Sequence, residues 1–150
     1  MSVAYPNLPV TFVGFVPGIT TPGGVTHQSI NDVGIMRTVP NMAIFDVGDA
    51  TDIEGVLDLV YEWNGPAYIR MLRKEVPRLF PANEPMVFNR ARTITEGDDV
   101  LILSSSICTE EAMRATAALE DKGVSVQHMH VSTLKPFTDP TIVEALKKCK

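Results

Sequence analysis

The stretch MAIFDVGDATDIEGVLDLVYEWNGPAYIRML, residues 42–72, decides the fold. It opens with an apolar run, Met42 to Val47, that is typical of a buried strand. Apolar residues then recur at helical spacing and form one face, at Ile53, Val56, Leu57, Val60 and Trp63. Gly65-Pro66 ends this helix, and a second strand follows at Ala67 to Leu72. Because strand, helix and strand alternate over so short a span, the sequence predicts an α/β fold with a parallel sheet.

The residues before this unit predict further elements of the same domain. Val10 to Val16 is β-branched and aromatic, which predicts a strand buried on both faces. Pro17 to Gly24 is a loop by composition. Thr51 and Glu54 have the spacing of a capping box, so we expect their side chains to begin the helix after Val47. A short helix that ends before Pro40 is indicated by three residues at helical spacing, Ile30, Val33 and Arg37.

The segment from Arg73 to Glu96 separates two predicted domains. It contains three prolines and shows no sustained hydrophobic period, so we interpret it as a partly extended connection. We therefore expect one domain at residues 1–76, a linker at 77–95 and a second domain at 96–150.

The second domain repeats the strand and helix pattern. Asp99 to Ser106 predicts a buried strand, and Thr109 is the expected N-cap of the next helix. Val124 to Val131 alternates with period two, which predicts a strand with one polar face. Asp139-Pro140 begins a last helix with proline at its first position. The positions expected to face inward are Ala112, Ala115 and Leu119 on the first helix, and Ile142, Val143 and Leu146 on the last.

Composition excludes several classes of protein. The chain has 150 residues, 45% of them hydrophobic, and a formal net charge of -5. This charge argues against a nucleic-acid surface, and no apolar run approaches the roughly 18 residues of a membrane span. The two cysteines, Cys108 and Cys149, form no CxxC motif. Without a signal-peptide pattern either, we expect a reduced, cytoplasmic protein.

The paired histidines His128 and His130 are the first candidates for a metal site. They lie two residues apart on a predicted strand, so both point to one face. No nearby cysteine or carboxylate completes a zinc site. We interpret them as a half-exposed strand face and expect no metal ligand in this chain. The sequence also lacks a P-loop and a G-x-G-x-x-G motif after a strand.

His27 and two arginines are the stronger candidates. His27 follows Gly23 and Gly24 and lies at or just before a predicted helix. It could only satisfy helix-end donors, or it could exchange a proton with a ligand near neutral pH. Arg70 and Arg73 lie on and after a strand whose carboxyl end opens onto the ligand edge of a parallel sheet. Either could bind a phosphate or sulfonate, or be a solvated surface arginine.

Three longer segments carry a family resemblance. GVTHQSINDVGIMRTVPNM, residues 24–42, followed by GPAYIRMLRKEVP, residues 65–77, resembles the second half of the transketolase pyrimidine-binding domain. VAYPNLPVTFVG, residues 3–14, is similar to the lead-in strand of that domain in the C-terminal subunit of bacterial split transketolases. EGDDVLILSSSICTEEAMRATAALEDKGVSVQHMHVSTLKPF, residues 96–137, is similar to the start of the family's C-terminal domain.

The resemblance implies an enzyme that uses thiamine diphosphate with Mg or Ca and moves a two-carbon ketol unit between sugar phosphates. His27 falls on the histidine that contacts substrate hydroxyls and assists proton transfer. Arg73 falls on the arginine that binds the terminal phosphate, and Arg70 is taken as scaffold. The implied partners are an N-terminal, diphosphate-binding subunit and a second copy of this subunit.

The resemblance also implies that this chain is an internal section of a longer subunit. The family's activating glutamate, its stacking aromatic residue and the metal ligands are expected to lie outside the chain, so the isolated chain is expected to be inactive. No cofactor-binding residue is assigned within it.

Two departures from the family pattern leave the substrate open. Gly23 and Gly24 stand where the family has an acidic residue, and Phe15 and Val16 stand where a further histidine is expected. Two alternatives therefore remain. One is an enzyme like 1-deoxyxylulose-5-phosphate synthase, and the other is a non-catalytic assembly partner with the same fold.

Overall fold

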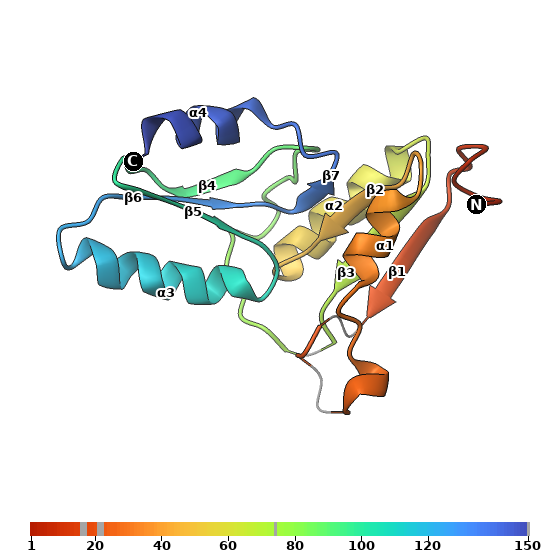
Figure 1. Ribbon diagram of the computed structural model, residues 1–150, viewed down its shortest axis with the longest axis horizontal. Coiled ribbons are helices and arrows are strands. Elements are labelled where there is room, and N and C mark those ends of the chain that lie inside the picture. The colour runs from red at the N-terminus through yellow and green to blue at the C-terminus, as the bar shows by residue number, and fades with distance from the viewer. Residues whose placement is uncertain (16–17, 21–22, 74, 150) are drawn as a thin grey trace.

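Two β-sheets lie side by side in the computed structural model (Figure 1), which describes residues 1–15, 18–20, 23–73 and 75–149. The first sheet has four strands in the order β1-β3-β2-β7, and the second has three in the order β4-β6-β5. The strands of the first sheet are β1 Thr11–Phe15, β2 Ala43–Asp46, β3 Ala67–Met71 and β7 Thr133–Lys135. The strands of the second sheet are β4 Arg92–Thr95, β5 Val100–Ser104 and β6 Val126–His130. This mixed α/β architecture confirms the predicted fold class.

The predicted strand, helix and strand unit forms the centre of the first sheet. β2 and β1 both pair in parallel with β3, and α2, Ala50–Glu62, connects β2 to β3. Alternate residues of β2 face opposite sides, because side chains alternate along a strand. Phe45 packs in the core cluster with Val56 of α2. Ile44 packs in a second cluster with Met36 of α1, Asp32–Thr38.

The second part of the chain contributes the last strand of the first sheet. β7 pairs antiparallel with β2, with Lys135 opposite Ile44 and Thr133 opposite Phe45. In the second sheet, α3, Cys108–Glu120, and α4, Pro140–Lys148, lie on opposite sides (Figure 1). Met129 and Val131 pack against Ile142 and Ala145 of α4. The two halves of the chain therefore share hydrogen-bonded structure.

Three predictions of burial are wrong. β1 was expected to be buried on both faces, yet Phe12, Val13 and Phe15 are exposed, because β1 is an edge strand whose faces are largely uncovered by the described residues. β5, too, is only partly buried. Inward positions expected on α3 and α4 are exposed at Ala115, Val143 and Leu146. On these two helices the buried faces instead include threonine and alanine, at Thr109, Thr116 and Ala145.

Two of the three predicted helix caps are also wrong. Asp49, not Thr51, caps α2, since its side chain accepts from the Asp52 N–H. Thr51 instead donates to the Phe80 carbonyl at 3.0 Å. α3 has Ile107 at the N-cap and no side-chain cap. The Asp139 cap of α4 is confirmed, with proline in the first turn.

The predicted linker contains one strand that its sequence did not indicate. Arg92–Thr95 forms β4 and pairs antiparallel with β6. Its four residues are too few to show a period against the prolines before them. The domain boundaries at 1–76, 77–95 and 96–150 stay predictions, and the predicted loop Pro17 to Gly24 lies partly outside the described residues.

Candidate functional site

The carboxyl edge of the first sheet gathers the predicted site residues. β1 and β3 are parallel, so both strands end at this edge (Figure 1). His27 lies in the connection that follows β1, and Arg73 comes two residues after β3. The carboxyl edge of a parallel sheet is where open α/β folds bind ligands. The topology therefore brings the two segments to the same edge.

His27 is the last residue of a short 3-10 helix, η1, Val25–His27. Its side chain is exposed, and its Nδ1 lies 2.9 Å from the Thr26 hydroxyl. α1 begins five residues later, so His27 does not lie directly at its N-terminus. A Cβ on Gly23 would lie 3.1 Å from the His27 Cβ. The glycine before His27 thus makes room for the histidine itself and leaves the imidazole open to solvent.

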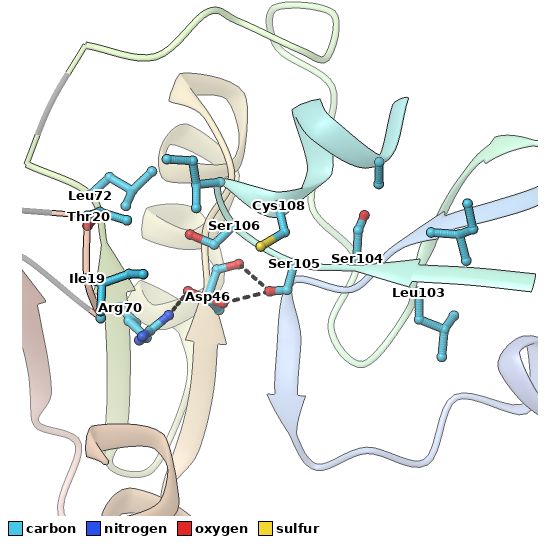
Figure 2. A pocket seen from close by; sticks show the side chains of 14 residues that line it. Ile19, Thr20, Asp46, Arg70, Leu72, Leu103, Ser104, Ser105, Ser106 and Cys108 are labelled. Carbon is cyan, nitrogen blue, oxygen red and sulfur yellow. Dashed lines mark hydrogen bonds and ion pairs between the residues drawn. The ribbon is translucent and has the colours of Figure 1, made fainter. Parts of the chain in front are cut away.

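A cavity of about 530 Å³ lies between this edge and the second sheet (Figure 2). Its lining comes from three places: the segment 18–20, the ends of β2 and β3, and the turn from β5 into α3. Among the lining side chains, Asp46 lies between Arg70 and Ser105 and is hydrogen-bonded to both (Figure 2). His27 and Arg73 are not among its lining residues, and the exposed side chain of Arg73 lies outside it. The roles predicted for His27 and Arg73 stay predictions.

Arg70 is the centre of an ion-pair network beside this cavity. Its Nε donates to Asp32 Oδ2 at 2.9 Å and its Nη1 to Asp46 Oδ1 at 3.3 Å. The Ser105 hydroxyl donates to the other Asp46 oxygen at 2.7 Å. Burial raises the pKa of Asp46, although Ser105 and Arg70 both oppose this shift. Burial and the hydrogen bond to Asp32 raise the pKa of Tyr68 to about 12, so its hydroxyl stays a donor.

A second buried network contradicts the prediction for His128 and His130. Both residues are fully buried, not half-exposed. His130 Nε2 lies 2.7 Å from Asp52 Oδ2, and its Nδ1 lies 2.7 Å from the Thr109 hydroxyl. His128 Nε2 lies 2.8 Å from the Ser104 hydroxyl. Burial and the neighbouring His130 lower the pKa of His128.

Asp52 connects this network to the first domain. It is fully buried at the start of α2 and accepts from Gly48 N–H, Arg92 and His130. Burial opposes its ionisation, but these hydrogen bonds outweigh burial and lower the pKa of Asp52. This contact could not be predicted from the sequence, because Asp52 and His130 lie far apart in the chain and no local period connects them.

The described residues alone do not form a site for the metal ion that would accompany a diphosphate. Among them, no group of three or more histidine, cysteine or carboxylate side chains could hold a metal ion. The carboxylate that faces the cavity, Asp46, is already ion-paired and hydrogen-bonded. The donor set present here therefore does not fit that metal ion.

Family models match almost the whole chain. Residues 1–78 match the model described as the transketolase pyrimidine-binding domain. Residues 89–150 match the transketolase C-terminal domain. The chain belongs to the transketolase family.

The relatives of this transketolase-family chain include a protein described as a transketolase subunit and one described as a C-terminal section. It is 35% identical over 149 residues to the 6-deoxy-6-sulfo-D-fructose transketolase subunit SqwH of Clostridium sp. (strain MSTE9), covering 99% of this chain and 46% of that protein. It is 32% identical over 151 residues to a putative transketolase C-terminal section of Methanocaldococcus jannaschii, covering 99% and 46%.

A solved structure described as a split-gene transketolase, inactive β4 tetramer, superimposes with a TM-score of 0.91 at 32% identity, covering 99% of this chain and 48% of that one. The chain therefore spans about half the length of the relatives it matches. Among the described residues, no helix is long and apolar enough to cross a membrane.

Proposed function

We propose that this chain is part of a thiamine-diphosphate-dependent transketolase subunit that transfers a two-carbon ketol unit between sugar phosphates. In this proposal residues 1–76 are the second half of the pyrimidine-binding domain, 77–95 the linker and 96–150 the first part of the C-terminal domain. The subunit acts in the cytoplasm with a diphosphate-binding partner subunit and a second copy of itself. Thiamine diphosphate, held with Mg or Ca mainly by residues outside this chain, supplies the carbanion chemistry when bound.

One observation carries the proposal. The short helix η1, Val25–His27, which we call the His27 turn, and Arg73 follow two neighbouring parallel strands at one edge of the sheet. An imidazole that is open to solvent can exchange a hydrogen bond or a proton with a substrate hydroxyl. A guanidinium at the same edge can bind a terminal anion through two parallel hydrogen bonds. A substrate with hydroxyls at one end and an anion at the other fits this pair.

Two anions could occupy the site proposed at Arg73. A phosphate and a sulfonate both offer oxygens to a guanidinium fork. The Clostridium relative is described as acting on a 6-deoxy-6-sulfo sugar, which supports testing both anions on this chain. We propose that the natural substrate carries a phosphate. The alternative outcome of the test below is that the site prefers a sulfonate.

His27→Ala tests the role of the histidine. In the full-length subunit assembled with its partner, we expect kcat/KM to fall about 10²-fold or more, the typical worth of one positioned proton-transfer group. The fold should be kept because the side chain is exposed. Steady-state ketol transfer measures the effect, with circular dichroism as the control. Turnover close to wild type would exclude His27 from the site.

Arg73→Ala tests the anion site. We expect KM to rise far more for a phosphorylated acceptor than for its dephosphorylated analogue, because only the first loses a charge-assisted contact. A sulfonated analogue measured beside them shows which anion the site prefers. Equal effects on all three substrates would place Arg73 outside the anion site.

A non-catalytic assembly partner is the second candidate, favoured by Gly23 and Gly24 at the position where the family has an acidic residue. Calorimetric titration of thiamine diphosphate and magnesium into the assembled complex separates the two candidates. Binding accompanied by ketol transfer supports the enzyme. If no cofactor binds even at a high concentration of thiamine diphosphate and magnesium, the result supports the assembly partner. Transfer from pyruvate instead of a ketose would indicate an enzyme like 1-deoxyxylulose-5-phosphate synthase.

A further inference from the structure

Arg70 holds together two segments of the proposed site that lie far apart in the sequence. It lies on β3, three residues before Arg73. Its Nε and Nη1 reach Asp32 and Asp46 at 2.9 and 3.3 Å. The side chain is only 17% exposed, so water competes little for these contacts. The guanidinium is therefore held between the start of α1 and the end of β2.

Asp32 connects Arg70 to the His27 turn through the chain. It is the first residue of α1, five residues after His27, and its Oδ2 also accepts from the Tyr68 hydroxyl at 2.9 Å. Between them, the Ser29 carbonyl accepts from the Gly18 N–H at 2.6 Å. The chain that leaves His27 is thus fixed at two points within five residues. Both partners of Asp32, Tyr68 and Arg70, belong to the strand that leads into Arg73.

The guanidinium of Arg70 is the shared counter-charge of two carboxylates. Arg70 faces two carboxylates, of which Asp32 is 10% and Asp46 6% exposed in the side chain. Asp32 Oδ1 is buried and has no hydrogen-bond partner among the described residues. Without Arg70, two buried carboxylates would lose their shared counter-charge and repel each other. Lysine cannot replace it fully, since an ammonium lacks the fork that reaches both carboxylates.

We propose that Arg70 and Asp32 are positioning residues, which fix the His27 turn relative to Arg73 and so set the geometry in which one substrate meets both groups. This assignment rests on the proposed function. Neither residue touches substrate: Arg70 acts through Asp32, and Asp32 acts through the segment that ends at His27. A misplaced turn reduces the fraction of bound substrate in a reactive geometry. Their loss therefore affects kcat more than KM.

The first test is Asp32→Asn in the full-length subunit assembled with its partner. The amide keeps the size of the side chain and can accept from Tyr68, but it loses the charge that holds Arg70. We expect kcat to fall about 10- to 100-fold while KM for a phosphorylated acceptor changes less than about threefold. An unchanged kcat would overturn the assignment.

Arg92 offers a matched control for Arg70. Its side chain is 18% exposed and it also bridges two carboxylates, Asp52 at 3.0 Å and Glu84 at 3.1 Å. Arg70→Met and Arg92→Met should destabilise the subunit to a similar degree in urea denaturation. Only Arg70→Met should lower kcat at a temperature where both variants are folded. Equal kcat losses would mean that Arg70 has a structural role alone.

A double-mutant cycle separates this assignment from the proposed function. In a His27→Ala background, Asp32→Asn should cause no further loss of kcat, because the turn no longer carries the group to be positioned. Losses that multiply would overturn the positioning role and leave the proposed function intact. A His27→Ala variant with wild-type turnover would overturn both. If Arg70→Met does not assemble, this cycle decides the question, since Asp32→Asn removes no volume from the fold.

Discussion

At the scale of single residues, the backbone of Gly24 shapes the turn that carries His27. Gly24 has φ 75° and ψ 179°, a combination that is essentially restricted to glycine. The residue before it, Gly23, leaves space for the His27 side chain. The two glycines that replace an acidic residue of the family pattern thus have a conformational role of their own.

Gly24→Ala should therefore strain the turn. We expect the free energy of unfolding to fall by about 1–3 kcal/mol, or the turn to shift and lower kcat/KM in the assembled enzyme. Gly34→Ala is the control: it lies within α1 with no heavy atom within 4 Å of an added Cβ. That change should stabilise the subunit by about 0.5–1 kcal/mol. Urea denaturation and turnover measure both, and identical behaviour of the two variants would contradict the strain at Gly24.

At the scale of elements, the sequence predicted those whose signal is local. β2, α2 and β3 stand out because each carries its own hydrophobic period within about a dozen residues. The alternation in β6 predicts a strand as well, but it does not predict that both faces are buried, because this burial depends on distant partners. Its histidines meet threonine and serine hydroxyls of α3 and β5, while Met129 between them packs on α4. The polar side chains of β6 therefore predict an exposed face, whereas the structure buries them.

In the candidate site, too, the residues that a local motif carries could be predicted, and those that meet only in the folded chain could not. His27 and Arg73 could be proposed from a motif, since their neighbours in the chain carry it. The Arg70 network could not, because Asp32, Asp46 and Ser105 come from three elements and meet only after the sheet has formed. Helix caps show the same limit: Asp49 and Thr51 are both good cap residues, and the contact of Thr51 with Phe80 leaves Asp49 as the cap.

Asp52→Asn tests the buried hydrogen bond between Asp52 of α2 and His130 of β6. We expect the free energy of unfolding to fall by about 3–5 kcal/mol at neutral pH, because the change leaves Arg92 and His130 without their buried counter-charge. Glu54→Gln, which breaks the exposed pair with Arg78, should have a much smaller effect. Urea denaturation of the full-length subunit compares them. Similar losses for both variants would argue against a stabilising role for the buried network.

The pH dependence of the same variant has a definite sign. The folded-state pKa of Asp52 lies below its ordinary value of 3.8. Its ionisation therefore contributes stability that is fully present above pH 3.8 and is lost as the pH falls through the folded-state pKa. The stability difference between wild type and Asp52→Asn should shrink as the pH falls below about 4. A constant difference from pH 7 to pH 3 and below would contradict the lowered pKa of Asp52.

At the scale of the whole molecule, one strand and several side-chain contacts connect the two sheets. β7 completes the first sheet, Asp52 contacts Arg92 and His130 of the second, and Asp46 contacts Ser105. The contacts of Asp46 and Asp52 lie at the end of β2 and the start of α2. The carboxyl edge of the first sheet is therefore in direct contact with the second domain through Asp46 and Ser105.

The exposed side chains of the edge strand β1 favour self-association of the isolated 150-residue chain. β1 is an edge strand, and Phe12, Val13 and Phe15 are 38%, 45% and 59% exposed. An uncovered apolar edge strand is a template for pairing with another chain. We therefore predict that residues 1–150 self-associate in solution through β1. We also predict no ketol transfer when thiamine diphosphate and magnesium are added, because no group of side chains among the described residues could hold the metal ion.

Size-exclusion chromatography with light scattering, run beside a coupled ketol-transfer assay, tests both parts of this last prediction. Val13→Lys and Phe15→Lys should each shift the chain toward monomer, because a charge on an edge strand opposes pairing. Leu146→Lys is the matched control, since Leu146 is 60% exposed on α4, far from β1 in the sequence, and it should leave association unchanged. Equal effects of all three lysines would mean that association follows net charge and not the β1 face. A monodisperse wild-type monomer with measurable transferase activity would overturn the prediction in both parts.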